Sequence, residues 1–141
     1  MYINAGYLNN SRTDFKDNST PLVVGSCGTY RLKTRPKLPT YWQKGRRDYQ
    51  ILYVANGKTH FWFDGREEIV SAGYMVLYKP EEIQKYVYYL EDNPEVFWIH
   101  FTGSDVKNIL AYHDISLDEH VFYCGVLPDY KALFRKIIQE L

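Results

Sequence analysis

The chain is poor in the residue types that mark disulfide frameworks, membrane spans and secretion signals. It has two cysteines, Cys27 and Cys124, far apart in the sequence and without CxxC or Cys/His spacing. Such a pair predicts buried reduced thiols rather than a disulfide or a metal site. No apolar run approaches the ~20 residues that span a bilayer. The N-terminus, MYINAGYLNN, has neither the basic nor the apolar region of a signal peptide. We therefore expect a soluble, cytoplasmic protein without a membrane partner.

An excess of charge of either sign is also missing, because 17 basic residues balance 17 acidic ones. The overall balance thus favours neither nucleic acid nor an anionic membrane as a partner. One segment departs from it: Arg31 to Arg47 holds seven basic residues and no acidic one. We interpret this segment as a solvated edge strand whose cations discourage edge-to-edge pairing. A functional patch that selects an anionic ligand, such as a uronate, is the alternative.

Aromatic residues are abundant, at 17% of the chain with 14 tyrosines. Short runs of Tyr, Val, Ile, Phe and Trp recur about every ten residues, which is typical of a small antiparallel sandwich or barrel. A first strand is expected after Pro21. The six that follow are predicted at 49–55, 58–64, 66–70, 74–78, 85–90 and 96–102. Several of these strands are apolar or aromatic on both faces, so the sequence leaves open which face lines the interior.

The turn residues support these boundaries. Asn56-Gly57 and Asp64-Gly65 tolerate positive φ and predict two hairpins. Gly73 opens the next strand and Pro80 ends it, because proline cannot donate to a ladder. Two hairpins and a proline stop predict a meander.

The two ends of the chain differ from this central part. Residues 1–20 are polar and predict an N-terminal arm, either disordered, hugging the surface or folded over a ligand. Residues 103–141 predict a helix that starts at Ser104 or Asp105, a short strand at 121–124 and a last helix from Pro128. The last helix carries an apolar stripe made of Tyr130, Leu133, Phe134, Ile137, Ile138 and Leu141.

The order and spacing of several motifs resemble the N-terminal effector domain of AraC-type transcription regulators. They are Arg-x-Asp-Tyr-x-Ile-x-Tyr-Val-x-x-Gly at 46–57, Asp64-Gly65, the 73–80 strand, Glu-Ile-Gln-Lys-Tyr at 82–86, and Trp-Ile-His-Phe at 98–101. The resemblance implies a mainly β fold: a cupin-like antiparallel barrel, or double-stranded β-helix, over 21–102, followed by C-terminal helices. It also implies a small-molecule effector, often a sugar, and a homodimer formed through the helical segment. The apolar stripe therefore either packs on its own barrel or forms a dimer seam.

The resemblance further implies DNA binding through a C-terminal helix-turn-helix domain that this chain lacks. The chain ends within a predicted helix, so we expect an effector domain of a longer regulator. The ligand-binding residues that we predict are Arg46, Tyr86, Trp98, His60 and Tyr30. Trp98 or Tyr86 would stack on a sugar, and Arg46, His60 or Tyr30 would hydrogen-bond it. Arg46 and Arg47 both adjoin the strand that starts at Asp48-Tyr49, so we expect one of them to point its guanidinium into the barrel mouth.

No metal or other cofactor is expected. Cupin enzymes hold a metal with an HxH pair, a Glu and a later His, but here Trp62 follows His60 and Gln84 stands where a His would follow the proline. AraC-type domains also often carry His at the Gln84 position. A sensor rather than an enzyme is therefore our main interpretation. The alternatives are a metal-independent sugar isomerase with His60 or His100 as general base, and a carbohydrate-binding module.

Overall fold

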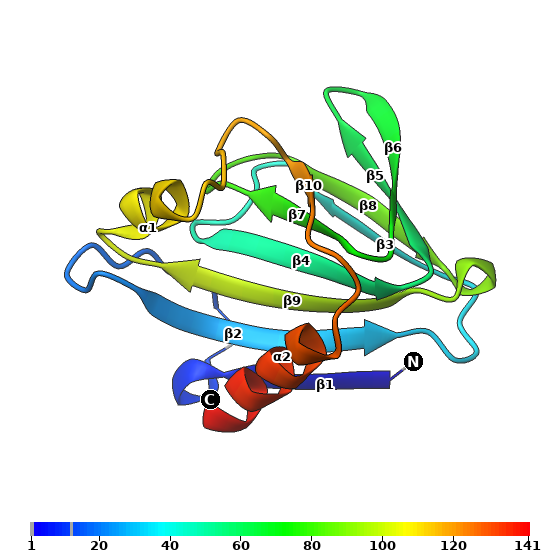
Figure 1. The fold of residues 1–141 in the computed structure, drawn as a ribbon, viewed down its shortest axis with the longest axis horizontal. Helices are drawn as coiled ribbons and strands as arrows, with labels where there is room; N and C mark the ends of the chain where they lie inside the picture. Colours follow the sequence, from blue (N-terminus) through cyan, green and yellow to red (C-terminus); the bar gives the residue numbers. More distant parts are fainter. Residues whose placement is uncertain (1, 12) are drawn as a thin grey trace.

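The computed structural model describes residues 2–11 and 13–141, which form two facing antiparallel sheets (Figure 1). The larger sheet has the order β1-β2-β9-β4-β7-β10 and the smaller one β3-β8-β5-β6. The six-stranded sheet contains β1 (Tyr2–Tyr7), β2 (Val23–Arg31), β4 (Tyr49–Asn56), β7 (Tyr74–Tyr78), β9 (Glu95–Thr102) and β10 (Val121–Tyr123). The four-stranded sheet contains β3 (Lys37–Trp42), β5 (Lys58–Phe63), β6 (Arg66–Ser71) and β8 (Gln84–Tyr89). This is the cupin-like barrel that the resemblance implies.

The connections are those of a barrel and not of a meander. Asp64-Gly65 forms the predicted hairpin between β5 and β6, with both residues at positive φ. The hairpin predicted at Asn56-Gly57 is wrong, because the strands on either side of it do not pair with each other. Strand β4 pairs with β7 and β9, whereas β5 pairs with β6 and β8. Asn56-Gly57 therefore carries the chain from one sheet to the other. The hydrophobic runs on either side pack across the interior instead of pairing along an edge.

One strand was not predicted from the sequence, and a second confirms the edge strand expected in the basic segment. Strand β1 lies within the polar arm and pairs in register with β2, from Tyr2 opposite Arg31 to Tyr7 opposite Ser26. Strand β3 lies in the basic segment and pairs only with β8, so it is an edge strand as the charge pattern favours. Residues 13–20 run over the surface, where the Asp17 amide donates to Thr102 Oγ1 and the Ser104 amide donates to the Thr20 carbonyl.

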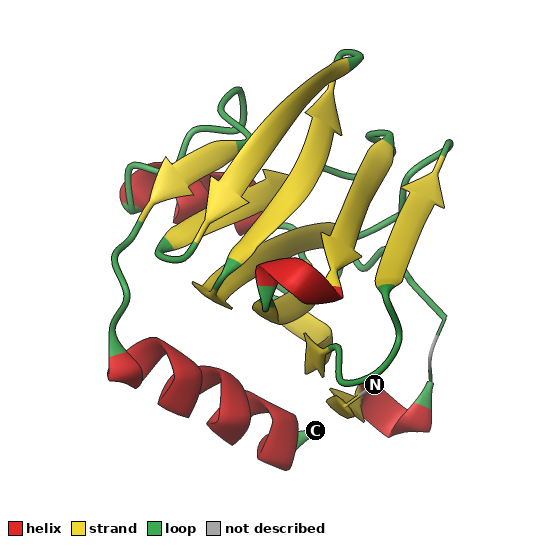
Figure 2. Ribbon diagram, turned by 90° about the vertical axis from the view of Figure 1, so that its right-hand side faces the viewer, coloured by secondary structure: helices red, strands yellow, loops and turns green. Residues whose placement is uncertain are grey.

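The helices cover one outer face of the barrel (Figure 2). Helix α2 (Pro128–Glu140) packs on β1, β2 and β9, and α1 (Val106–Tyr112) buries Val106 and Leu110 against the end of the same sheet. Short 3₁₀ turns follow β1 at Leu8–Asn10 and β8 at Leu90–Asp92. Among the described residues, no helix is long and apolar enough to cross a membrane.

The apolar stripe of α2 is largely used within the chain. Phe134 and Ile138 are buried against Cys27, Tyr53 and Phe97, and the other members except Leu133 pack on the same cluster. Leu133 is 57% exposed. Packing on its own barrel thus accounts for most of the stripe. Cys27 and Cys124 are both free, and Cys27 is fully buried there.

Candidate functional site

One half of the barrel interior is hollow. This space, called the inner cavity below, has a volume of about 320 Å³, within the range of small-molecule pockets. Side chains from both sheets line it: Ile3, Tyr7, Ser26, Tyr30, Leu38, Thr40, Trp42, Arg46, Gln50, Gln84, Tyr86, Tyr88, Trp98 and His100. Because side chains alternate between the faces of a strand, Gln84, Tyr86 and Tyr88 of β8 and Trp98 and His100 of β9 reach this space.

Trp98 forms an aromatic wall of the cavity. Its ring lies 6.2 Å from that of Tyr7, 5.9 Å from Tyr30 and 5.0 Å from His100, centroid to centroid. Gly28 lies opposite Trp98 on β2, and a Cβ at this position would lie 2.5 Å from the indole ring. The glycine therefore makes the space that the indole occupies, and Trp98 is held at 4% exposure.

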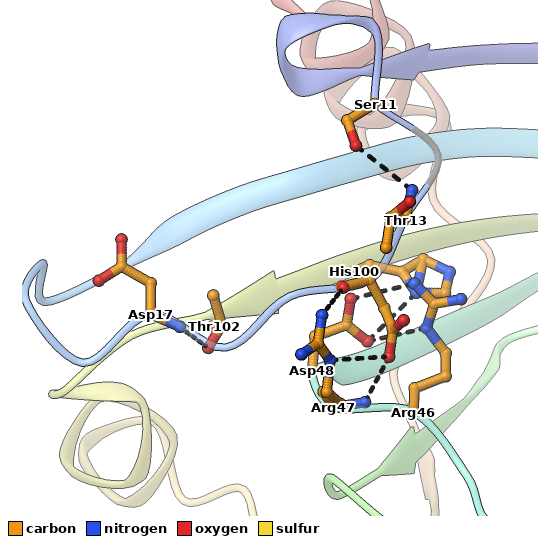
Figure 3. Close-up of polar contacts among 9 residues, drawn as sticks. Ser11, Thr13, Asp17, Arg46, Arg47, Asp48, His100 and Thr102 are labelled. Carbon is orange, nitrogen blue, oxygen red and sulfur yellow. Dashed lines mark hydrogen bonds and ion pairs between the residues drawn. The ribbon is translucent and has the colours of Figure 1, made fainter.

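Arg46 and Asp48 form a bidentate ion pair at the cavity (Figure 3). Arg46 Nε donates to Asp48 Oδ1 at 2.8 Å and Nη2 donates to Oδ2 at 3.0 Å. Burial raises the pKa of Asp48, and the guanidinium limits that rise. His100 Nδ1 lies 3.6 Å from Asp48 Oδ1, which is too long for a hydrogen bond. The arginine charge is thus already matched by a carboxylate.

His100 is a neutral imidazole at physiological pH. Burial, aided by the nearby Arg46 charge, lowers the pKa of His100 to about 3. The phenols stay protonated, because burial raises the pKa of Tyr86 to about 12 and that of Tyr88 well above its ordinary value. The cavity therefore presents neutral hydrogen-bonding groups together with one neutralised ion pair.

Five buried polar atoms in the wall of this cavity have no hydrogen-bond partner within the described part of the protein. They are Gln50 Oε1, Gln84 Nε2, Tyr88 Oη, Trp98 Nε1 and His100 Nδ1. An unsatisfied buried polar atom costs about 1–3 kcal/mol, so native proteins keep few of them. Both donors and acceptors are present. A small ligand whose groups donate and accept hydrogen bonds would satisfy this set.

Four of the five predicted ligand-binding residues line the inner cavity: Arg46, Tyr86, Trp98 and Tyr30. His60 does not line it. Its Nδ1 lies 2.9 Å from Glu67 Oε1 and its Nε2 lies 2.9 Å from Asp92 Oδ2 on the outside of the smaller sheet. Both ring nitrogens are engaged there, so His60 does not join the other four. Of the two arginines, Arg46 lines the cavity, whereas Arg47 binds Asp14 through its amide and its guanidinium.

Sequence reasoning left Gln50 and Tyr88 out of the site and considered Gln84 and His100 only for other roles. A signal for them exists. Gln50 and His100 interrupt strands that are otherwise apolar on both faces, and such polar residues need a partner or a ligand. Within the described residues, no group of three or more His, Cys, Asp or Glu side chains is placed to hold a metal ion.

The fold and the cavity define a cupin-like barrel that encloses a small-molecule pocket. The family model of the AraC-like ligand binding domain matches residues 26–141, and the chain belongs to this family. No curated protein sequence matches the chain significantly.

Solved structures share the fold. ToxT from Vibrio cholerae bound to (E)-4-(8-methylnaphthalen-1-yl)but-3-enoic acid is 14% identical with a TM-score of 0.56, over 86% of this chain and 48% of ToxT. Unsaturated fatty acid bound wild-type ToxT is 17% identical with a TM-score of 0.52, over 89% of this chain and 48% of ToxT. The chain thus spans about half the length of ToxT.

Proposed function

We propose that the chain senses a small, uncharged, polyhydroxylated molecule, most simply a neutral sugar, for a transcription regulator. The five unpartnered polar atoms in the inner cavity carry this proposal. A sugar hydroxyl both donates and accepts, so a few hydroxyls match a wall that mixes Gln50 Oε1 with Trp98 Nε1 and Tyr88 Oη. The flat Trp98 indole adds an apolar surface for the ring.

The charge of the cavity favours a neutral sugar over a fatty acid or a uronate. Among the residues that the structure describes, Arg46 is the only lysine or arginine in its lining, and both oxygens of Asp48 already accept from it. A ligand carboxylate would have to displace Asp48 or lie beside it, and like charges in a buried site are unfavourable. ToxT is bound to acids in its solved structures, but its likeness to this chain is one of fold and does not carry over the ligand chemistry.

The function would follow from linkage. A ligand that binds more tightly to one arrangement of barrel, helix and partner domains shifts the population toward that arrangement. A homodimer and a separate DNA-binding domain belong to this proposal. The exposed Leu133 on α2 is the residue of the predicted dimer seam that remains available for it.

The test is calorimetric titration with a panel of neutral sugars, uronates and an unsaturated fatty acid. Binding of a neutral sugar, lost in Gln84→Met and kept in Gln43→Met, would support the proposal, because Gln84 is 1% exposed in the cavity and Gln43 is exposed on the surface. Binding of the fatty acid alone would overturn the sugar assignment.

The ion pair offers a second test of ligand charge. Asp48→Asn removes the carboxylate that neutralises Arg46, so we expect uronate binding to appear and neutral sugar binding to weaken. The variant should also lose about 3 kcal/mol of stability, because it breaks a buried pair. An unchanged preference for neutral sugars would contradict the role assigned to the ion pair.

A metal-independent isomerase is the second candidate, because His100 lies in the cavity with an unpartnered nitrogen. A pKa of about 3 makes His100 a weak base at neutral pH, which favours recognition over proton abstraction. NMR spectra of each bound sugar after long incubation separate the two functions: a sensor returns its ligand unchanged, and an isomerase converts it.

A further inference from the structure

A second hollow lies outside the barrel and has a different chemistry from the inner cavity. This basic pocket, of about 490 Å³, is bordered by the segment after β1 (Lys16), the loop before β4 (Arg47), the turn between β7 and β8 (Lys79) and the start of α1 (Lys107). Four segments far apart in sequence thus bring one cation each to the same hollow. The concentration of positive charge thus arises from folding and not from a run of basic residues in the sequence.

The pocket is strongly unbalanced in charge. Of the described residues in its lining, Glu81 is the only one with a carboxylate and four are cations, although the chain as a whole is neutral. Within the described part of the chain, Lys16, Lys79 and Lys107 form no salt bridge. Arg47 is held by Asp14, because its amide donates to Oδ2 at 2.7 Å and its Nη2 donates to the carbonyl oxygen at 2.6 Å. The three lysines thus differ from Lys131, which pairs with Glu95 at 2.6 Å.

Gathering like charges is unfavourable unless a counter-charge occupies the space between them. Lys79 is also partly buried, which reduces the water that screens its charge. The hydroxyl of Ser104 and the backbone around Gly103 border the same space. A compact anion with several acceptor oxygens matches this arrangement, because each ammonium group can donate to a different oxygen.

We propose that the basic pocket binds a phosphate-class anion, either inorganic phosphate or the phosphate group of a small monoester. Lys79 and Lys107 hold it from two sides, and Lys16 and Arg47 add charge from the arm side. The site is separate from the inner cavity: Arg46 lines the cavity and its neighbour Arg47 lines the pocket. This proposal does not depend on the identity of the ligand inside the barrel.

The test is to titrate the ¹⁵N-labelled chain with inorganic phosphate and to measure the amide chemical shifts by NMR. A titration with sodium chloride at matched ionic strength is the control. A parallel titration with glycerol 3-phosphate distinguishes free phosphate from a monoester, since the true class binds more tightly. We expect saturable shifts at residues 16, 47, 79, 104 and 107 with phosphate and none with chloride.

Charge-matched variants separate a site from general attraction to cations. Lys79→Ala with Lys107→Ala should weaken phosphate binding by about tenfold or more, as expected for the loss of charge-assisted hydrogen bonds. Lys37→Ala with Lys136→Ala removes two exposed lysines elsewhere and should leave the affinity unchanged. Equal losses in the two variants, or shifts spread over all exposed lysines, would overturn the proposal. The amide spectrum of each variant reports whether it is folded.

Discussion

The two halves of the barrel interior are built on the same strands but have opposite characters. The ladder between β4 and β9 shows the change: Val54 faces Val96 at one end, Leu52 faces Trp98 in the middle, and Gln50 faces His100 at the other end. The first half is filled by apolar side chains, including the fully buried Phe61 and Val76. The second half is hollow and polar. Packing in the filled half thus stabilises the fold, whereas the hollow half keeps unsatisfied polar groups that a ligand can bind.

The largest expected effect breaks the filled half. Phe61→Ala removes a ring that is 0% exposed and lies 4.9 Å from Tyr86 and 5.9 Å from Phe63, centroid to centroid. We expect a loss of about 3–5 kcal/mol in the free energy of unfolding, measured by urea denaturation. Tyr112→Ala is the control, because Tyr112 is 84% exposed and should change stability by less than about 0.5 kcal/mol. A similar small effect for Phe61→Ala would contradict the packing described for this half.

The next largest effect is a dependence of stability on pH that comes from the hollow half. In the folded chain His100 has a pKa of about 3, well below the value of about 6.5 in an unfolded chain. As the pH falls below about 6.5, the unfolded chain therefore binds more protons than the folded chain, and the free energy of unfolding decreases. Between neutral pH and pH ~5 this amounts to about 2 kcal/mol. His100→Gln should flatten the stability profile by that amount in denaturation at several pH values. An unchanged acid slope would show that His100 is not held neutral.

A smaller effect should have the opposite sign to that of Phe61→Ala. Gln84→Met replaces a buried amide whose Nε2 has no partner within the described protein, so the ligand-free chain should gain about 1 kcal/mol of stability. Gln43→Met at an exposed position should leave it unchanged within about 0.5 kcal/mol. Calorimetric melting measures both. A destabilised Gln84→Met would mean that the amide supports the fold rather than a ligand.

The smallest effect comes from the histidine outside the barrel. Burial lowers the pKa of His60, but hydrogen bonds and charge from Glu67 and Asp92 outweigh it, so the folded pKa is raised. Lys58 also pairs with Asp92 there. The stability from protonated His60 is present below the unfolded pKa and disappears as pH rises through the folded value. His60→Gln should therefore cost about 0.5 kcal/mol at mildly acidic pH and less at alkaline pH. An equal cost at all pH values would exclude this imidazolium.

The central strands were predictable from sequence because their own residues specify them. Turn residues, β-branched residues and aromatics predicted β4 to β9 with ends shifted by at most one residue, and the apolar period predicted α2 from Pro128. Strand β1 escaped prediction because it lies in a polar segment, and β3 was expected only as an edge strand without bounds, because it is short and contains a proline. They are strands because neighbours supply their ladder partners, and tertiary pairing overrides weak local propensity.

The cavity was harder to predict than the fold. Arg46, Tyr86 and Trp98 lie in the family pattern, but β4 and β8 carry large apolar or aromatic side chains on both faces. Periodicity therefore gave no inward face. His60 was misplaced for the same reason: alternation puts Phe61 in the interior and turns His60 outward, and only the assembled sheet shows which of the two is inside.

Strand β1 ties the cavity to the C-terminal helix. Its inner side contributes Ile3 and Tyr7 to the cavity wall, and its outer side lies so close to α2 that a Cβ at Gly6 would be 2.6 Å from the Ile138 carbonyl oxygen. A ligand that presses on the wall and a partner that pulls on the helix thus act on one six-residue strand from opposite sides. A ligand that fixes this strand would therefore also make the helix harder to displace. The coupling free energy is reciprocal, so a partner on the helix would change the affinity for the ligand by the same factor.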